Sequence, residues 1–267
     1  MTQKIPYWHV DAFSARPFGG NQAAVMVLDE WLPDDVLVAI GAENLFAETA
    51  FVVRDATGEA DWELRWCTPT YEIALCGHAT LASGHVLLQR DGGERVTFRT
   101  RKSGVLEVVK VGYAYELALP AIATVSDTAA NQAEAIRLLG AEPLEIVRSE
   151  LGYNIYLYDN EAAVRGLAPD IRGLERLGSD QFIVTARGEK TDIVSRVFVP
   201  GGGVDEDSVT GSAHAVLTPY WAEKLGRDSF TAHQASERGG DLTLRLAGDR
   251  AWLGGPCVTV VEGAFYL

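Results

Sequence analysis

The chain of 267 residues carries 23 lysines and arginines against 37 aspartates and glutamates, a formal net charge of −14 at pH 7. Such a chain lacks the clustered cations with which proteins bind nucleic acids or anionic membrane surfaces, so we expect neither as a partner. Its 47% apolar and 22% charged residues are typical of a folded globular protein.

The cysteine pattern and the N-terminal residues favour a location in the cytoplasm. Cys67, Cys76 and Cys257 are odd in number and irregularly spaced, which argues against a disulfide framework and against a CxxC zinc site. The segment that begins at Met1 lacks the apolar core of a signal peptide. No apolar stretch approaches the roughly 20 residues that span a bilayer. We therefore expect a cytoplasmic protein.

The first half of the chain alternates predicted strands with two predicted helices. Alternating or continuous apolar patterns predict strands over 8–13, 23–28, 48–53 and 62–66. The pattern over 33–40 predicts a helix, because its leading acidic residues suit a helix N-terminus. Residues 77–88 form a helical run without charge, which is typical of a helix buried all round. Short strands follow between 96 and 119.

The second half repeats this order loosely. Its predicted strands are 154–158, 182–185, 195–199, 242–246 and 257–261. Residues 211–217 form a second uncharged helix that starts at a glycine. The repeat predicts two similar domains, 1–120 and 121–267, with the return of the final residues to the first domain left open.

The two uncharged helices begin at Gly77-His78 and Gly211-Ser212. The first turn of a helix has N–H groups without intrahelical partners at the positive end of the helix dipole, and this arrangement binds carboxylates and phosphates. If the halves are related by a pseudo-twofold axis, both helix starts face one cleft between the domains. The alternative is that the glycines only permit close packing.

Five side chains are candidates for chemistry. Glu48 opens an apolar strand, where partial burial raises a carboxyl pKa and suits it to proton transfer; the alternative is an exposed strand-end carboxylate. A helix start favours neutral imidazole at His78, whose alternative is a hydrogen-bonded cap. Asp207 is a candidate or a simple helix cap. His214 is expected in the core. Cys76 is either a thiolate or a small buried apolar residue.

Other motif classes are missing from the sequence. It contains no GxGxxG that opens a helix after a strand and no GxxxxGK[ST], so we expect no nucleotide cofactor. It also lacks HExxH or paired histidines, so we expect no metal. A GxSxG nucleophile elbow is absent too.

Several stretches, taken together, resemble the PhzF-like proteins of phenazine biosynthesis, which are relatives of diaminopimelate epimerase. They are 10–21 (VDAFSARPFGGN), 43–51 (ENLFAETAF), 68–69 (TP), 75–82 (LCGHATLA), 195–200 (SRVFVP), 206–214 (EDSVTGSAH) and 234–240 (QASERGG). They run in family order from the first predicted strand nearly to the C-terminus. Any one of them alone is a weak signal, whereas the set is specific.

The resemblance implies the diaminopimelate epimerase-like fold, an α/β fold of two pseudo-symmetric domains. In each domain a mixed sheet curls around a central helix. The resemblance also implies an active site in the cleft between the domains, no cofactor and commonly a homodimer. Members of this kind catalyse a proton-shift isomerisation, and the best known acts on trans-2,3-dihydro-3-hydroxyanthranilate. The implied substrate here is a small carboxylated metabolite.

The resemblance also implies roles for individual residues. Glu48 matches the family's catalytic carboxylate, which takes a proton from carbon and returns it elsewhere on the conjugated system. His78 and Asp207 match polar residues that orient the substrate and assist proton movement. The implied substrate-binding positions are Asn21, Gly77, Gly211, Ser212 and Ser236.

Two departures bear on the alternatives. Epimerases of this fold use two cysteines, and Cys76 lies near the first position, but the matching second stretch, 207–212, contains none. A one-base shift by Glu48 therefore fits better than an amino-acid racemase or epimerase that uses Cys76. Ser208 replaces an expected proline, which alters loop stiffness more than chemistry. A non-catalytic protein that binds small anions or acts as a scaffold is the third hypothesis.

Overall fold

The computed structural model describes residues 3–267, and the chain separates into two compact units. The first unit combines the chain up to Leu119 with Gly254–Leu267, and the second is Pro120–Leu253. Gln3 and Leu267 exchange two backbone hydrogen bonds of 2.8 and 3.0 Å, so both ends of the described chain meet in the first unit.

The first unit contains a mixed β-sheet. Its strands lie in the order β17–β1–β2–β3–β4–β6–β7–β8, in which β2–β3 and β4–β6 are parallel and the other neighbours antiparallel. The short β5 pairs with β4. The strands are β1 (Lys4–Ala12), β2 (Asn21–Val27), β3 (Glu48–Arg54), β4 (Trp62–Cys67), β5 (Glu72–Ile73), β6 (Arg95–Thr100), β7 (Val105–Val111), β8 (Ala114–Pro120) and β17 (Cys257–Tyr266).

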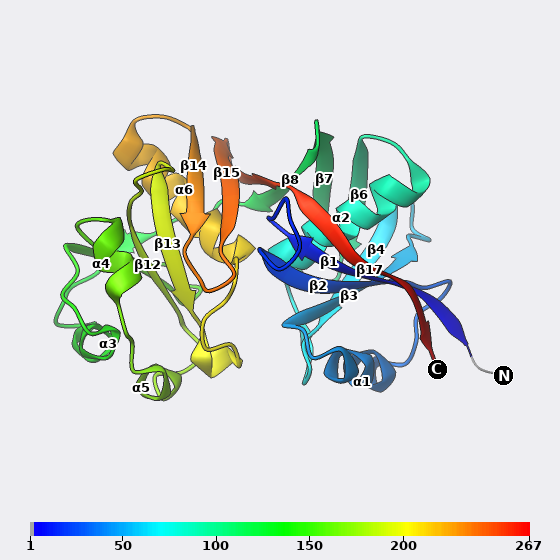
Figure 1. The fold of residues 1–267 in the computed structure, drawn as a ribbon, viewed down its shortest axis with the longest axis horizontal. Coiled ribbons are helices and arrows are strands. Elements are labelled where there is room, and N and C mark those ends of the chain that lie inside the picture. The colour runs from blue at the N-terminus through cyan, green and yellow to red at the C-terminus, as the bar shows by residue number, and fades with distance from the viewer. Residues whose placement is uncertain (1–2) are drawn as a thin grey trace. The chain divides into compact units, whose positions relative to one another are not determined.

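This sheet curls around the helix α2 (Gly77–Asp91), as Figure 1 shows. The helix contacts β1, β2 and β17 as well as β6 and β7, which lie far apart in the strand order. Every residue from Gly77 to Leu88 is buried, which confirms the prediction from the uncharged sequence. Gly84 permits the close approach to β7, because a Cβ at this position would overlap the Val108 side chain. A second helix, α1 (Asp34–Asn44), packs Leu37 and Ile40 into a separate apolar cluster with Met26 and Phe51.

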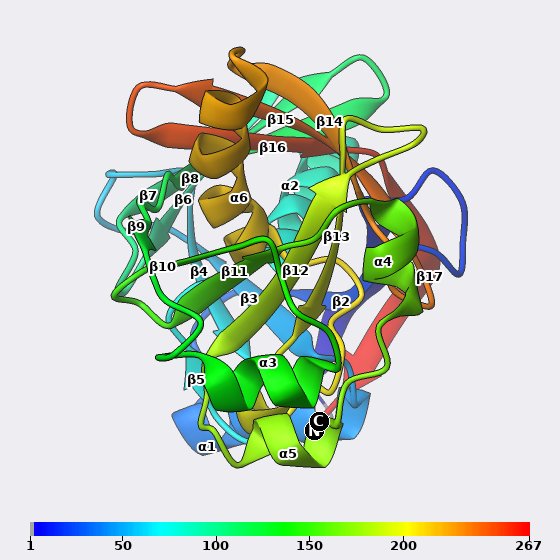
Figure 2. The same cartoon turned by 90° about the vertical axis from the view of Figure 1, so that its left-hand side faces the viewer.

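The second unit has the same plan. Its sheet order is β9–β10–β11–β12–β13–β14–β15, with β11–β12 and β13–β14 parallel and the other neighbours antiparallel. The helix α6 (Gly211–Leu225) contacts β11 and β15, and Figure 2 shows it beside the strands. The strands are β9 (Val125–Ser126), β10 (Glu145–Arg148), β11 (Tyr153–Leu157), β12 (Gln181–Arg187), β13 (Ile193–Phe198), β14 (Ser229–Gln234), β15 (Gly240–Ala247) and β16 (Arg250–Gly255).

The two units share one succession of strand pairings. From β1 to β7, and again from β10 to β15, neighbours alternate as antiparallel, parallel, antiparallel, parallel and antiparallel. The buried helix precedes the fifth strand of this succession in both units, α2 before β6 and α6 before β14. This internal repeat confirms the predicted fold class, with a mixed sheet around a central helix in each half.

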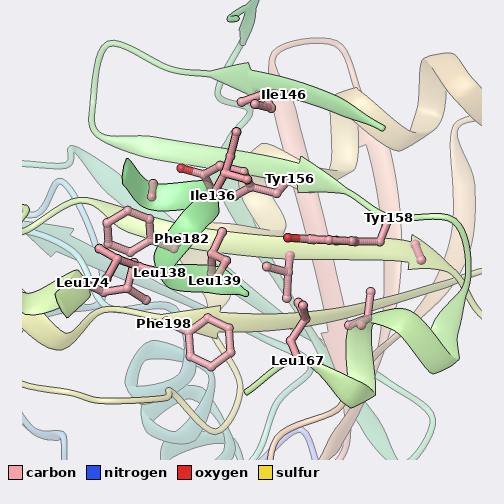
Figure 3. Packing of buried hydrophobic residues seen from close by; sticks show 14 of the residues in the cluster. Ile136, Leu138, Leu139, Ile146, Tyr156, Tyr158, Leu167, Leu174, Phe182 and Phe198 are labelled. Carbon is pink, nitrogen blue, oxygen red and sulfur yellow. The ribbon is translucent and has the colours of Figure 1, made fainter. Parts of the chain in front are cut away.

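Short helices that no sequence pattern predicted lie beside the second unit's apolar core. They are α3 (Ala133–Leu139), α4 (Glu161–Gly166), α5 (Ile171–Glu175) and the 3-10 turn η1 (Pro200–Gly202). Figure 3 shows Ile136, Leu139 and Leu174 packed with aromatic rings from β11–β13. Helices of one or two turns are too short to show a helical hydrophobic period. Among the helices of residues 3–267, none is both long enough and apolar enough to cross a membrane.

Candidate active site

The first unit brings three of the predicted residues to one edge of its sheet. Asn21 is the first residue of β2 and Glu48 is the first residue of β3. These strands are parallel neighbours, with Ala23 opposite Glu48, so both side chains lie where the strands begin. His78 is the second residue of α2, and the start of this helix lies beside the starts of β2 and β3.

The side chains meet around the imidazole of His78. Its Nε2 lies 3.2 Å from Glu48 Oε2, and its Nδ1 lies 3.1 Å from Asn21 Nδ2. The sulfur of Cys76 lies 3.5 Å from Nδ1 and 4.0 Å from Nε2. Asn21, Cys76 and His78 are buried, whereas the Glu48 side chain keeps 16% of its surface exposed. Solvent therefore reaches this cluster on the Glu48 side.

The carboxylate of Glu48 is only partly satisfied. Its Oε2 atom is buried and, within residues 3–267, has no hydrogen-bond partner of good geometry. The 3.2 Å contact with His78 Nε2 is thus an ion-pair contact rather than an aligned hydrogen bond. A buried carboxylate oxygen without a full hydrogen-bond complement lowers stability, and a role in catalysis, here accepting a proton, is one reason why such an atom is retained.

The two ionisable neighbours of Glu48 differ in their preferred state. Burial and the nearby Glu48 carboxylate raise the pKa of the Cys76 thiol to about 11, so it remains a thiol near neutral pH. Burial lowers the pKa of His78, but Cys76 and Glu48 raise it by more, and the net pKa lies well above 6.5. Because Cys76 is uncharged near pH 7, we assign this effect to the Glu48 carboxylate.

This ionisation corrects one expectation from the sequence. A helix start by itself favours neutral imidazole, whereas the carboxylate in contact with His78 favours imidazolium. Asn21 adds an orienting contact. When His78 is neutral, Nδ1 accepts a hydrogen bond from the Asn21 amide, and the ring then carries its hydrogen on Nε2, which faces Glu48. For Cys76, the alternative of a small buried residue fits the structure better than a thiolate.

In the second unit, Asp207 and a buried glutamine organise the start of α6. The Oδ2 atom of Asp207 accepts a 2.7 Å hydrogen bond from the Thr210 hydroxyl. Gln234 is fully buried, and its Nε2 donates to the Asp207 carbonyl at 2.7 Å while its Oε1 accepts from the Thr210 N–H at 2.8 Å. Gln234 lies in the stretch 234–240 that resembles the family, but no sequence pattern predicted a role for it.

The two predicted serines of this unit have different surroundings. Ser212 is the second residue of α6, and its hydroxyl lies 3.4 Å from Gln181 Nε2. Ser236 donates a 2.7 Å hydrogen bond to the Ser208 carbonyl and accepts one of 3.1 Å from the Gly239 N–H. Ser236 therefore joins two loops, a bracing role that the sequence did not indicate.

The starts of α2 and α6 have matching chemistry. Each helix begins with a glycine, Gly77 or Gly211, and in neither does the residue before it cap the helix with its side chain. Neither first turn contains an acidic residue. Helix starts of this kind suit the binding of an anion by backbone N–H groups, which stays a prediction for this chain.

His214 was expected in the core, and the structure confirms this. It is fully buried in α6, and its Nδ1 lies 2.8 Å from the Thr210 carbonyl oxygen. Burial lowers its pKa to about 4, so it stays neutral near pH 7. His214 therefore takes part in packing and not in proton transfer.

Comparisons with known proteins agree with this architecture. The model of the phenazine biosynthesis-like protein family, PhzC-PhzF, matches residues 10–263. A protein of Pseudomonas aeruginosa named an uncharacterized isomerase is 46% identical over 266 residues, covering 99% of each chain. The crystal structure of a PhzF family phenazine biosynthesis protein from Enterococcus faecalis has a TM-score of 0.92 at 38% identity, covering 99% of this chain and 100% of that one.

A more distant likeness extends to epimerases. The crystal structure of a hydroxyproline epimerase from Agrobacterium vitis has a TM-score of 0.62 at 13% identity, covering 99% of this chain and 93% of that one. At this identity the likeness concerns the fold alone, and it agrees with the fold class expected from the sequence.

Proposed function

The chain belongs to the PhzC-PhzF, phenazine biosynthesis-like family, and on that premise we propose that it is an isomerase that shifts a proton within a small carboxylated metabolite. Glu48 is the general acid and base of this proposal. The observation that carries it is the Glu48 carboxylate itself, held at a strand start beside His78 with a buried oxygen to which no residue from 3 to 267 donates a hydrogen bond of good geometry.

The proposed reaction needs one group that takes a proton and gives it back. Glu48 removes a proton from an acidic carbon of the substrate and returns it to another carbon of the same conjugated system. His78 stabilises the carboxylate before the transfer and orients it, because its Nε2 lies 3.2 Å from Oε2. Asn21 in turn orients His78 through Nδ1. General acid–base catalysis of this kind accelerates a reaction by roughly 10²–10⁴-fold.

The same proposal assigns substrate binding to the helix starts. The backbone N–H groups at Gly77, next to the proposed base, hold a carboxylate without a lysine or arginine. In the second unit we assign the same role to Gly211 and Ser212, with Asp207 and Ser236 orienting polar groups of the substrate. The donors at a helix start act locally, within the first turn. They can therefore bind an acidic metabolite even though the net charge of the protein is negative.

The test is proton NMR in D2O with a panel of carboxylated metabolites. The wild-type protein should introduce deuterium at a carbon of at least one of them, and Glu48→Gln should lower that rate by about 10²-fold or more. Glu43→Gln on the exposed face of α1 is the matched control and should exchange like the wild type. Exchange by Glu48→Gln at the wild-type rate would assign the base to another residue.

A further inference from the structure

The proposed base shares its surroundings with two ligands that soft divalent cations prefer. One carboxylate oxygen of Glu48, the sulfur of Cys76 and one ring nitrogen of His78 all lie within 4.8 Å of one another. Cysteine sulfur, histidine nitrogen and carboxylate oxygen are the usual ligands of zinc. We propose that these three side chains form a binding site for a thiophilic divalent cation of the Zn²⁺ class, and that the bound cation occupies the carboxylate that the isomerisation needs.

The spacing of the three atoms suits a tetrahedral ion. Zinc binds sulfur at about 2.3 Å and nitrogen or oxygen at about 2.0–2.2 Å, so neighbouring ligand atoms lie roughly 3.3–3.7 Å apart. His78 Nε2 and Glu48 Oε2 are 3.2 Å apart, and Cys76 Sγ lies 4.0 Å from Nε2. The sulfur lies 3.5 Å from Nδ1, so rotation of the Cys76 side chain toward Nε2 is needed to complete the coordination, and the fourth position would be left to water.

Glu48 also offers the cation an oxygen that the protein leaves unsatisfied. Its Oε2 atom is buried and, among residues 3–267, has no well-aligned donor, so coordination there replaces only the ion-pair contact with His78. The Asn21 side chain contacts the ring nitrogen of His78 that would not bind the metal. With Nε2 on the metal, Nδ1 carries a hydrogen, and the Asn21 amide at 3.1 Å can turn its oxygen to accept it. Metal-bound histidines are commonly held by such a second contact.

The binding step is an exchange of protons for the cation. A bond forms from the metal to the sulfur of Cys76 while the S–H bond breaks, and its proton goes to solvent. When His78 is an imidazolium, its Nε2 proton is released as well. No oxidant or reductant takes part. The bound cation then blocks proton transfer, because the carboxylate of Glu48 is coordinated and no longer acts as a base.

The positions of the three ligands in the sequence explain why no metal site was predicted from it. Cys76 and His78 are adjacent to the start of α2, while Glu48 comes from β3, so the set has no spacing that resembles a zinc motif. Cys257, by contrast, belongs to no group of three metal-type ligands found within residues 3–267. It therefore serves as the matched control for a thiol elsewhere in the same unit.

The experiment is a titration of tag-free protein with Co²⁺ in the absence of any substrate. A cobalt–thiolate bond gives a charge-transfer absorption band, and four-coordinate cobalt gives intense visible bands. We expect one equivalent of Co²⁺ to produce both in the wild type and in Cys257→Ser, and Zn²⁺ to remove them by displacement. Cys76→Ser should lose the charge-transfer band, and Glu48→Gln should keep it with binding weaker by about 10-fold or more.

Two results would overturn the site. One is the absence of a charge-transfer band in folded wild-type protein, and the other is equal cobalt spectra for the wild type and Cys76→Ser. Circular dichroism of each variant separates a lost ligand from a lost fold. Because no substrate is present, failure of the isomerase proposal in the deuterium experiment leaves this titration unaffected, and the reverse also holds.

Discussion

The Nε2 atom of His78 lies 3.2 Å from the Oε2 atom of Glu48, and this contact favours the charged form of the imidazole. A histidine at a helix start would by itself stay neutral. Beside the carboxylate its pKa rises well above 6.5, despite nearly complete burial. Contact with the Glu48 side chain therefore favours the imidazolium form of His78.

Cys76→Ala should retain the proton exchange of the wild type within a factor of about 10. The pKa of the Cys76 thiol is about 11, so the thiolate that a racemase needs is nearly absent near pH 7. The measurement is the D2O exchange rate with any substrate found active, and Cys257→Ala is the control. Complete loss of exchange in Cys76→Ala alone would favour the racemase hypothesis instead.

The ion pair of His78 should make stability depend on pH in a defined direction. The folded-state pKa of His78 is raised above its unfolded value of 6.5, so its contribution is present at lower pH. That contribution disappears as the pH rises through the folded-state pKa. Urea unfolding of wild type and His78→Gln at a series of pH values should show a difference that shrinks with rising pH. A difference that grows with pH would contradict the assigned charge state.

Unlike His78, His214 should make the folded protein less stable as the pH falls. Its pKa falls from 6.5 to about 4 in the folded protein, because the ring is fully buried. Protonation of the unfolded chain then costs up to about 3 kcal/mol of stability as the pH drops from about 6.5 to about 4. In urea unfolding, His214→Gln should lower stability near pH 7 but reduce this acid sensitivity. An equal acid sensitivity of His214→Gln and the wild type would contradict the assigned neutral state of His214.

Gln234→Leu should destabilise the second unit by roughly 2–4 kcal/mol. The substitution removes the hydrogen bonds of Gln234 to the buried Thr210 N–H and to the part-buried Asp207 carbonyl. Differential scanning calorimetry should show the loss. Gln22→Leu removes a side chain with a single 3.3 Å contact to His9 and should cost less than about 1 kcal/mol. Equal effects of the two variants would show that Gln234 does not organise the start of α6.

Local sequence patterns determined most of the architecture. The uncharged runs 77–88 and 211–217 predicted buried helices, and the strand patterns around them predicted two similar halves. These predictions hold because the side chains that follow a helical or strand period within one element also decide which face it buries. The short helices α3–α5 escaped prediction because a helix of one or two turns shows no such period.

The chemistry of the site depended on contacts that no local pattern contains. The motifs at 43–51 and 75–82 singled out Glu48 and His78. Only the folded chain shows that these two side chains are in contact and that the Asn21 amide contacts the other ring nitrogen of His78, Nδ1. Pairing of β2 with β3, and the start of α2 beside them, brings these residues together. The charge of His78 follows from that proximity together with burial, because a pKa responds to neighbours in space rather than in sequence. In the same way, Gln234 is one polar residue among many in the sequence, and its three hydrogen-bond partners exist only in the folded second unit.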